Sequence, residues 1–347
     1  MNRMKHRPHK RTMLYTAFLT LLVLWSVLSL APRPDNHEGE NPFITKDEAP
    51  LLIAHGGGNH EFPDNTLEAF YNAYHADPEA MMETDVSLTK DDVLILSHDT
   101  TLDRKTNLTD ALIEDVNYED LMDDEVDFGY ENPIDEDGFN TSGVFRKYQN
   151  HENETVTPED VPYPRGVEPR HESAFLATTL EALIQTFPDS YINVEIKQKG
   201  ETGKRALDKT LELLETLDDE YDTFERIVLA SFHESLYQAI RTYHQEENAD
   251  LMFSPQESSI RRFVVLEKTR LDVFYHDPVT VFQLPTTQQG ILFAKPSFLH
   301  TAHKHNIAVH FWTINDPDTM RKLIAIGADG IMTDRPHLLA EILNGSQ

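Results

Sequence analysis

The chain has 347 residues, 39% of them hydrophobic, a formal net charge of −30 and no cysteine. This length supports one large core, and the missing cysteines exclude disulfides, a thiol nucleophile and a thiolate zinc site. Five of the 30 cations stand in the first eleven residues. The remainder is therefore strongly acidic, which argues against nucleic-acid binding.

The N-terminal segment predicts a membrane anchor. Residues 13–31 read MLYTAFLTLLVLWSVLSLA and carry no charge, and about 19 helical residues rise about 28 Å, enough to cross a bilayer core. The basic tail, 1–12, orients the N-terminus towards the cytoplasm and the main domain outside the cell membrane. A cleaved signal peptide is the alternative, because Ser29-Leu30-Ala31 resembles a cleavage site. Residues 32–50, rich in proline, are expected to form a tether.

From residue 51 onward, strand-like apolar runs alternate with helical patterns. The predicted strands are 51–55, 82–86, 191–197, 226–231, 250–253, 280–284, 308–314 and 330–333. The predicted helices are 66–76, 179–187, 204–217, 233–243, 257–267, 297–306, 317–326 and 336–343. Eight β/α units predict an α/β fold, a TIM (β/α)8 barrel over 51–343. The additional run 93–97 is predicted to fold back as a hairpin arm that carries His98 to the barrel mouth.

Residues 107–177 interrupt this alternation after the second strand. Between 110 and 160 there are 17 acidic residues and only two cations, Arg146 and Lys147. Long loops of this kind are usually functional or disordered. We interpret the segment as an enlarged acidic insertion in which five aromatic residues provide a modest core: Phe128, Tyr130, Phe139, Phe145 and Tyr148.

Three carboxylates on neighbouring strands predict a metal site. Glu83 and Asp85 are two residues apart and so share one face of their strand. Glu195 shares a face of the next strand with Lys197. In a TIM barrel the functional side chains gather at the C-terminal ends of the strands. Clustered carboxylate oxygens favour one hard divalent cation, Ca²⁺ or Mg²⁺, with Mn²⁺ also compatible. Simple ion pairing with Lys197 or an arginine is the alternative.

The motifs around these acids resemble those of the glycerophosphodiester phosphodiesterase family. The motifs are His55-Gly56-Gly57-Gly58, Pro63-Asp64-Asn65-Thr66, Glu83-Thr84-Asp85-Val86, Thr89-Lys90-Asp91, His98-Asp99 and Leu102-Asp103-Arg104-Lys105-Thr106. The likeness resumes at 193–197, 311–315 and 327–336. It implies a metal-dependent barrel that hydrolyses glycerophosphodiesters, small-molecule substrates, to glycerol phosphate and an alcohol.

The resemblance also implies roles for individual residues. His55 and His98 become the acid–base pair, and two histidines suit proton transfer near neutral pH. Lys197 and Arg104 are expected to bind the phosphate, and Trp312 to pack on the glycerol carbons. Other histidines, including His303 and His305, are interpreted as surface or loop residues.

Two positions depart from the family pattern. Gly56 stands where the family usually has a phosphate-binding arginine, and Asp64 stands where it has glutamate. Glycines allow backbone N–H groups to approach an anion closely. If phosphate binding is weakened by the missing arginine, Gly56→Arg is expected to lower KM; if glycine is required by the backbone, the substitution is expected to damage the loop.

Two other functions remain open. One is a phospholipase C- or D-type barrel that acts on intact lipid, which the membrane anchor favours and the acidic insertion does not. The other is a non-catalytic phosphodiester-binding protein, against which the retained histidines and carboxylates argue. The sequence does not distinguish the alcohol, the acid from the base, or direct water attack from a cyclic intermediate.

Overall fold

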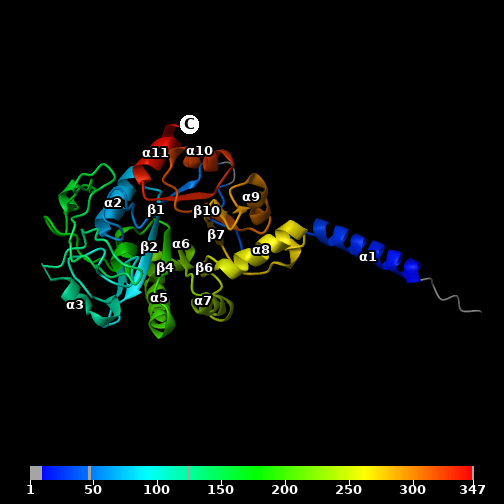
Figure 1. The fold of residues 1–347 in the computed structure, drawn as a ribbon, viewed down its shortest axis with the longest axis horizontal. Coiled ribbons are helices and arrows are strands. Elements are labelled where there is room, and N and C mark those ends of the chain that lie inside the picture. Colours follow the sequence, from blue (N-terminus) through cyan, green and yellow to red (C-terminus); the bar gives the residue numbers. More distant parts are fainter. Residues whose placement is uncertain (1–9, 46–47, 124, 346–347) are drawn as a thin grey trace, which may run out of the picture.

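The computed structural model describes residues 10–45, 48–123 and 125–345, and its centre is a parallel barrel (Figure 1). Around the ring the strands are β6 (Met252–Phe253), β5 (Ile227–Ala230), β4 (Ile192–Ile196), β2 (Met81–Leu88), β1 (Leu51–His55), β11 (Gly330–Thr333), β10 (Ala308–Phe311) and β7 (Val281–Leu284). A hydrogen bond of 3.0 Å from Thr280 N to Phe253 O joins the two ends of this row. The TIM barrel and its eight predicted strands are confirmed.

Helices surround the barrel as expected (Figure 1). They are α2 (Leu67–Ala76), α4 (Leu180–Thr186), α5 (Gly200–Tyr221), α7 (Glu234–Glu246), α8 (Glu257–Thr269), α9 (Pro296–His303), α10 (Pro317–Ala325) and α11 (Pro336–Gly345). Their starts follow local capping chemistry: Thr66, Thr179 and Asp316 each accept a hydrogen bond from a backbone N–H of the first turn. The short helix α6 (Thr223–Arg226) and the hairpin of β8 (Thr287–Gln288) and β9 (Ile291–Leu292) were not expected.

The hairpin arm after the second strand is also confirmed. Strand β3 (Leu94–Leu96) pairs antiparallel with the end of β2, with Leu96 opposite Val86. Asp92 takes φ 64° in the connecting turn, a conformation that aspartate tolerates better than most residues. The hydrogen bond of 2.9 Å from Ser97 N to Asp85 O then brings the chain back to the C-terminal end of β2.

Apolar side chains fill the half of the barrel interior that lies away from the C-terminal ends of the strands. Eight side chains fill it, each at most 5% exposed: Phe43, Ile53, Met81, Val228, Met252, Val281, Ala308 and Met332. The outward faces of the strands pack on the helices in a separate, larger cluster. Because both strand faces are buried, the strands read as nearly continuous apolar runs in the sequence.

The segment expected to be a tether is packed along 32–45. Asn36 Nδ2 donates to Asp277 O at 2.6 Å, and Asn41 Nδ2 donates to Thr280 O at 2.8 Å. Phe43 is fully buried at the floor of the barrel. Both carbonyls also accept a backbone N–H, from Val279 and Ala308, so each asparagine adds a second hydrogen bond. These bonds join the stretch to the barrel, and it is therefore not a free linker.

His305 lies in the turn after α9, as expected for a loop residue, but it is not on the surface. Its side chain is fully buried, with Nδ1 2.9 Å from Asn36 Oδ1 and Nε2 3.3 Å from an oxygen of Asp272. Both of its ring nitrogens are therefore satisfied by the packed N-terminal segment and the loop beside it, which the sequence pattern did not place.

Two peripheral parts complete the molecule. Helix α1 (Lys10–Leu30) extends away from the barrel, and by length and composition its residues Thr12–Leu30 are sufficient to cross a membrane (Figure 1). Of the predicted basic tail, residues 1–9 lie outside the described residues. The insertion contains the short helix α3 (Tyr118–Leu121), and its apolar residues form a small cluster together with Phe62, Ala69, Ile95 and Leu102 of the barrel domain. Of the aromatic residues expected in its core, Phe128 and Tyr148 are buried, whereas Phe145 is 41% exposed.

His310, on β10 inside the barrel, generates a prediction about acid stability. It is fully buried, and within the described part of the chain neither ring nitrogen has a hydrogen-bond partner. Burial lowers its pKa from 6.5 to about 4, against an opposing effect of Asp329. Between these pH values the unfolded chain binds a proton that the folded chain does not, so folding stability falls as pH falls. His310→Leu should remove about 3 kcal/mol of this acid-induced loss of unfolding free energy.

Urea unfolding at pH 7 and pH 4 measures the effect. His300→Leu, which replaces an exposed histidine, is the control and should keep the pH dependence of the wild type. An unchanged dependence in His310→Leu would show that this histidine is not the acid-sensitive group.

Candidate active site

A cavity of about 350 Å³ opens at the C-terminal ends of the barrel strands. Six of the predicted site residues line it: His55, Glu83, His98, Glu195, Lys197 and Trp312. Asp85 lies beside Glu83 and Glu195. A larger hollow of about 640 Å³, between the insertion and α11, contains none of the predicted site residues. The chemistry therefore concentrates in the smaller cavity at the barrel mouth.

The carboxylates of Glu83, Asp85 and Glu195 form a trio. One oxygen from each lies within 4.8 Å of the others. The parallel register of β2 and β4 sets Asp85 opposite Glu195, and Glu83 precedes Asp85 on the same strand face. Burial and then the charge of Asp85 raise the pKa of Glu83 to about 7, and burial raises the pKa of Glu195. Three ionised carboxylates this close are stable only beside positive charge.

Lys197 supplies part of that charge. Its Nζ lies 3.0 Å from Asp85 Oδ1 and 3.0 Å from Glu195 Oε1, so the ion pairing weighed from the sequence does occur. One lysine offsets only one of three negative charges, and His55, protonated beside Glu83, offsets at most a second. Asp85 Oδ1 accepts no hydrogen bond of good geometry from the described residues. Three carboxylates that offer only oxygen ligands, one of them without a good hydrogen bond, fit a hard divalent cation.

His55, at the end of β1, is oriented by a carboxylate from the other end of the chain. Its Nδ1 lies 2.6 Å from Asp334 Oδ1, and Asn315 Nδ2 donates to Asp334 Oδ2 at 2.6 Å. Burial opposes protonation, but Glu83 and Asp334 raise the pKa of His55 to about 10. The ring is thus held with Nε2 available for substrate.

His98 has a comparable arrangement. Its Nδ1 lies 3.1 Å from Asp99 Oδ1, and this bond raises the pKa of His98. Arg104 Nε donates to the other oxygen of Asp99, and its terminal nitrogens lie 3.3 Å from the oxygens of Asp64. Arg104 does not line the cavity. The geometry therefore favours Arg104 as a positioning residue for Asp99 and His98 over the expected phosphate contact.

Other contributors were not singled out from the sequence. Asn65 takes φ 60° and joins the trio to the preceding loop, since Nδ2 donates to Asp85 Oδ2 at 3.2 Å and Oδ1 accepts from Thr84 at 2.7 Å. Asn65, Asn315 and Asp334 all stand inside the motifs quoted above. The sequence offered one signal for them, because each is a polar residue directly after a strand or a glycine turn. It did not indicate which side chain each would contact.

The cavity has an apolar wall on the side of β5, β6 and β7. Trp312, just past the end of β10, meets Phe232 edge to face with ring centroids 6.1 Å apart. Phe232 is 62% exposed, and Ile260 and Leu284 continue the lining. This wall suits a carbon chain or the apolar face of a small alcohol, whereas the opposite wall carries the ionisable groups.

Gly56 and its two neighbours form a tight turn after β1. All three have positive φ, 55°, 82° and 109°. A Cβ on Gly56 would lie 2.8 Å from Asp64 Cβ, and one on Gly57 would lie 2.7 Å from Ala69 Cβ. Gly56 N also donates to Glu83 Oε2 at 3.0 Å. The glycines allow the turn to contact the trio and α2 at short range.

Comparison with known proteins points to one family. The sequence model described as the glycerophosphoryl diester phosphodiesterase family matches residues 55–338. A glycerophosphodiester phosphodiesterase of Caldanaerobacter subterraneus subsp. tengcongensis is 23% identical over 302 residues, covering 84% of this chain and 97% of that protein. A lysophospholipase D of Rattus norvegicus is 24% identical over 315 residues, covering 84% and 85%.

Solved structures share the fold. A putative glycerophosphoryl diester phosphodiesterase from Silicibacter pomeroyi has a TM-score of 0.61 at 20% identity, covering 88% of this chain and 96% of that one. An Oleispira antarctica phosphodiesterase, in complex with the product sn-glycerol-3-phosphate, has a TM-score of 0.56 at 17% identity, covering 85% and 97%. At these identities the structural likeness establishes the barrel alone.

The turn geometry decides between the two outcomes expected for Gly56→Arg. The side chain would need a left-handed backbone and would displace Asp64, which holds Arg104. We therefore expect a lower melting temperature and a lower kcat, instead of a lower KM. Gly143→Arg is the matched control, because Gly143 also has positive φ (62°) but open space around its Cβ position. A tenfold lower KM at an unchanged melting temperature would instead support the view that the missing arginine weakens phosphate binding.

Proposed function

Because the chain belongs to the glycerophosphoryl diester phosphodiesterase family, we propose that its barrel hydrolyses a glycerophosphodiester to glycerol phosphate and an alcohol. The observation that carries this proposal is the meeting of two aspartate-oriented histidines, a carboxylate trio and Lys197 in one cavity. The family membership supplies the reaction class, and the geometry supplies groups for each of its steps.

Glu83, Asp85 and Glu195 would hold one divalent cation, Ca²⁺, Mg²⁺ or Mn²⁺. Such a cation, when bound, polarises phosphoryl oxygens and offsets the charge that develops on them. The support for this part of the proposal is the oxygen-only donor set and the poorly satisfied Asp85 Oδ1. Lys197, released from part of its pairing, would be able to contact the phosphate.

The two histidines would move the protons. Cleavage of the P–O bond requires that the attacking oxygen loses a proton and that the departing alkoxide gains one. Asp334 and Asp99 occupy Nδ1 of His55 and His98, which leaves Nε2 of each ring for these transfers. The pairing carboxylates also stabilise each imidazolium once it forms, so either ring is suited to the acid or the base role.

A lysophospholipid is a second candidate substrate. The apolar wall of Phe232, Ile260, Leu284 and Trp312 is adequate for the start of an acyl chain, and some relatives are named lysophospholipase D. A product assay separates the candidates. The full-length protein in detergent is incubated with glycerophosphocholine, lysophosphatidylcholine or phosphatidylcholine, and the released phosphates are identified. Glycerol phosphate from glycerophosphocholine supports the first proposal, lysophosphatidic acid the second, and no cleavage of any substrate contradicts both.

We also propose that α1 anchors the barrel in the cell membrane, with the N-terminus cytoplasmic and the barrel outside. The length and apolar composition of Thr12–Leu30 support this, together with the basic residues that precede it. The cavity lies at the C-terminal ends of the strands, whereas α1 joins the barrel near Asp272–Phe274, just before the N-terminal end of β7. This placement favours substrates that arrive from the water.

Removal of divalent cations should abolish the activity. The trio binds a cation only while its carboxylates are ionised and correctly spaced, so Asp85→Asn should weaken metal affinity severalfold or more. We expect that exhaustive chelation stops turnover and that Ca²⁺, Mg²⁺ or Mn²⁺ restores it. Asp137→Asn, at an exposed position of the insertion, is the control. Full turnover in a protein shown by elemental analysis to be metal-free would refute the metal assignment.

Replacement of either oriented histidine should lower the rate. His55→Ala and His98→Ala should each reduce kcat by roughly 10²–10⁴, the usual contribution of a general acid or base. His98 is exposed at the end of the hairpin arm, so the melting temperature of His98→Ala should change little. That of His55→Ala should fall, because this variant loses the ion pair with Asp334. The control is His300→Ala, on the exposed surface of α9. Near-normal kcat in either variant would exclude that histidine from proton transfer.

A further inference from the structure

Charge is distributed very unevenly in this chain. It has 60 acidic residues, yet none occurs between 278 and 315, a segment that carries Lys295 and Lys304. The C-terminal half of α8 and the residue after it add Lys268 and Arg270. In three dimensions these segments lie on one side of the barrel, and the acidic insertion lies on the other (Figure 1).

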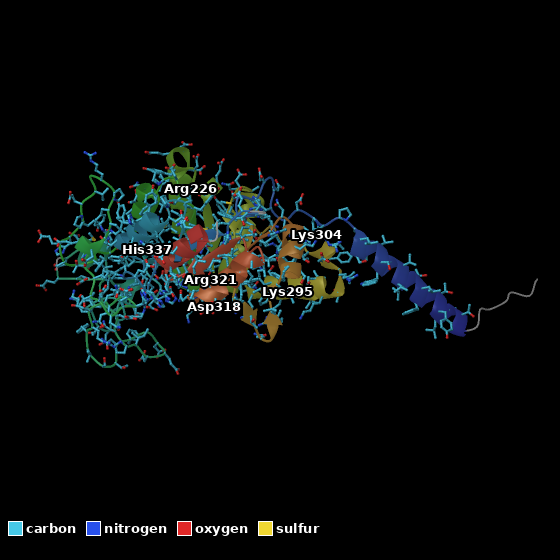
Figure 2. All side chains as sticks on the ribbon, turned by 90° about the horizontal axis from the view of Figure 1, so that it is seen from above. Arg226, Lys295, Lys304, Asp318, Arg321 and His337 are labelled. Carbon is cyan, nitrogen blue, oxygen red and sulfur yellow. The ribbon has the colours of Figure 1, made fainter. Side chains whose placement is uncertain are left out.

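Helix α1 leaves the barrel on this same side. Trp25 Nε1 donates to Thr269 O, at the C-terminal end of α8, with a distance of 2.9 Å. Arg33 joins the end of α1 to the barrel, since its guanidinium bonds both Ser29 O (3.2 Å) and Asp272 Oδ1 (3.0 Å). Figure 2 shows Lys304 close to the point where α1 departs. These contacts fix where the barrel surface lies along the helix.

The contact with Trp25 places the end of α8 at a defined depth. Trp25 lies five residues before Leu30, the last residue of the candidate span, and five helical residues rise about 7–8 Å. With α1 across a bilayer, the end of α8 therefore lies at the level of the lipid headgroups. Tryptophan is enriched at this level because its apolar ring can contact lipid while its N–H donates to a polar partner.

The surface around this point suits an anionic lipid layer. We define the anchor-side face as Val265, Lys268, Arg270, Phe274 and Lys304. Its two apolar members, Val265 and Phe274, are 61% and 53% exposed. Its three cations are exposed. Among the described residues no ion pair joins any of them to a carboxylate, whereas the neighbouring Lys295 pairs with Glu267. Unpaired cations beside apolar side chains are typical of a surface that contacts lipid headgroups.

We propose that the anchor-side face docks on anionic lipid headgroups, so that α1 and the side of the barrel are bound to the membrane together. The proposal rests on insertion of α1, but it does not depend on the phosphodiesterase activity. Attraction of the cations and repulsion of the acidic insertion both turn this face to the bilayer. The cavity, at the other end of the strands from the α1 contact, stays open to water.

The absence of cysteine allows a direct test. Val265→Cys introduces a unique thiol into the full-length protein, and Val144→Cys, at a 53% exposed valine of the insertion, is the matched control. Each variant is labelled with a fluorophore and inserted into vesicles of equal parts phosphatidylglycerol and phosphatidylcholine, or of phosphatidylcholine alone. Quenching by acrylamide, which is uncharged, reports access from water. We expect several-fold weaker quenching at 265 than at 144 in the anionic vesicles, and a smaller difference in the neutral ones.

Charge reversal tests the electrostatic part. Lys268→Glu with Lys304→Glu, in the Val265→Cys background, should restore quenching in the anionic vesicles. Lys90→Glu with Lys204→Glu, two exposed lysines away from α1, should leave the protection intact. Equal quenching of the labels at 265 and 144 overturns the proposal. So does weak quenching at 265 that is the same in both kinds of vesicle and persists in the Lys268→Glu, Lys304→Glu variant. Extraction of the wild type by carbonate would overturn it too, because α1 would not be inserted.

Discussion

The site depends on one electrostatic constraint: three carboxylates are buried side by side, with only Lys197 and His55 as positive neighbours. Removing carboxylates from water is costly unless positive charge and hydrogen bonds replace the solvent. The barrel meets part of this cost with Lys197, with the N–H of Gly56 and with Asn65. The remaining negative charge favours a divalent cation at the trio, and the proposed cation would let the pocket of a very acidic protein accept an anionic phosphodiester.

The same constraint explains why the turn after β1 requires glycine at position 56. Gly56 approaches Glu83 closely enough to donate a backbone hydrogen bond only because no side chain separates the turn from Asp64. Asp64 in turn pairs with Arg104 and Lys105, and Arg104 holds Asp99 beside His98. A chain of ion pairs therefore connects Asp64, in the loop after β1, to His98 on the hairpin arm, and Gly56 packs against the start of that chain. A change at the glycine turn should be felt at both histidines.

Local patterns predicted the barrel and the trio because both depend on short-range periodicity. Strands buried on both faces are continuous apolar runs, and residues two apart on a strand share a face, so the pairing of Glu83 with Asp85 follows from their spacing in the sequence. The partner of His55 could not be predicted in this way, because Asp334 lies 279 positions away and only the closure of β1 on β11 brings it near. Similarly, the burial of His305 and Phe43 follows from packing of an N-terminal segment whose prolines and polar residues resemble a linker.

The central claim is that the trio binds one divalent cation and that Lys197 is its substitute in the metal-free chain. The most direct measurement is the anomalous diffraction of a crystal grown with Mn²⁺. The account predicts a single strong peak within about 2.0–2.6 Å of an oxygen from each of Glu83, Asp85 and Glu195, with Lys197 Nζ moved away from at least one of its two carboxylates. A peak elsewhere, or Lys197 still bridging Asp85 and Glu195 at saturating Mn²⁺, would contradict it.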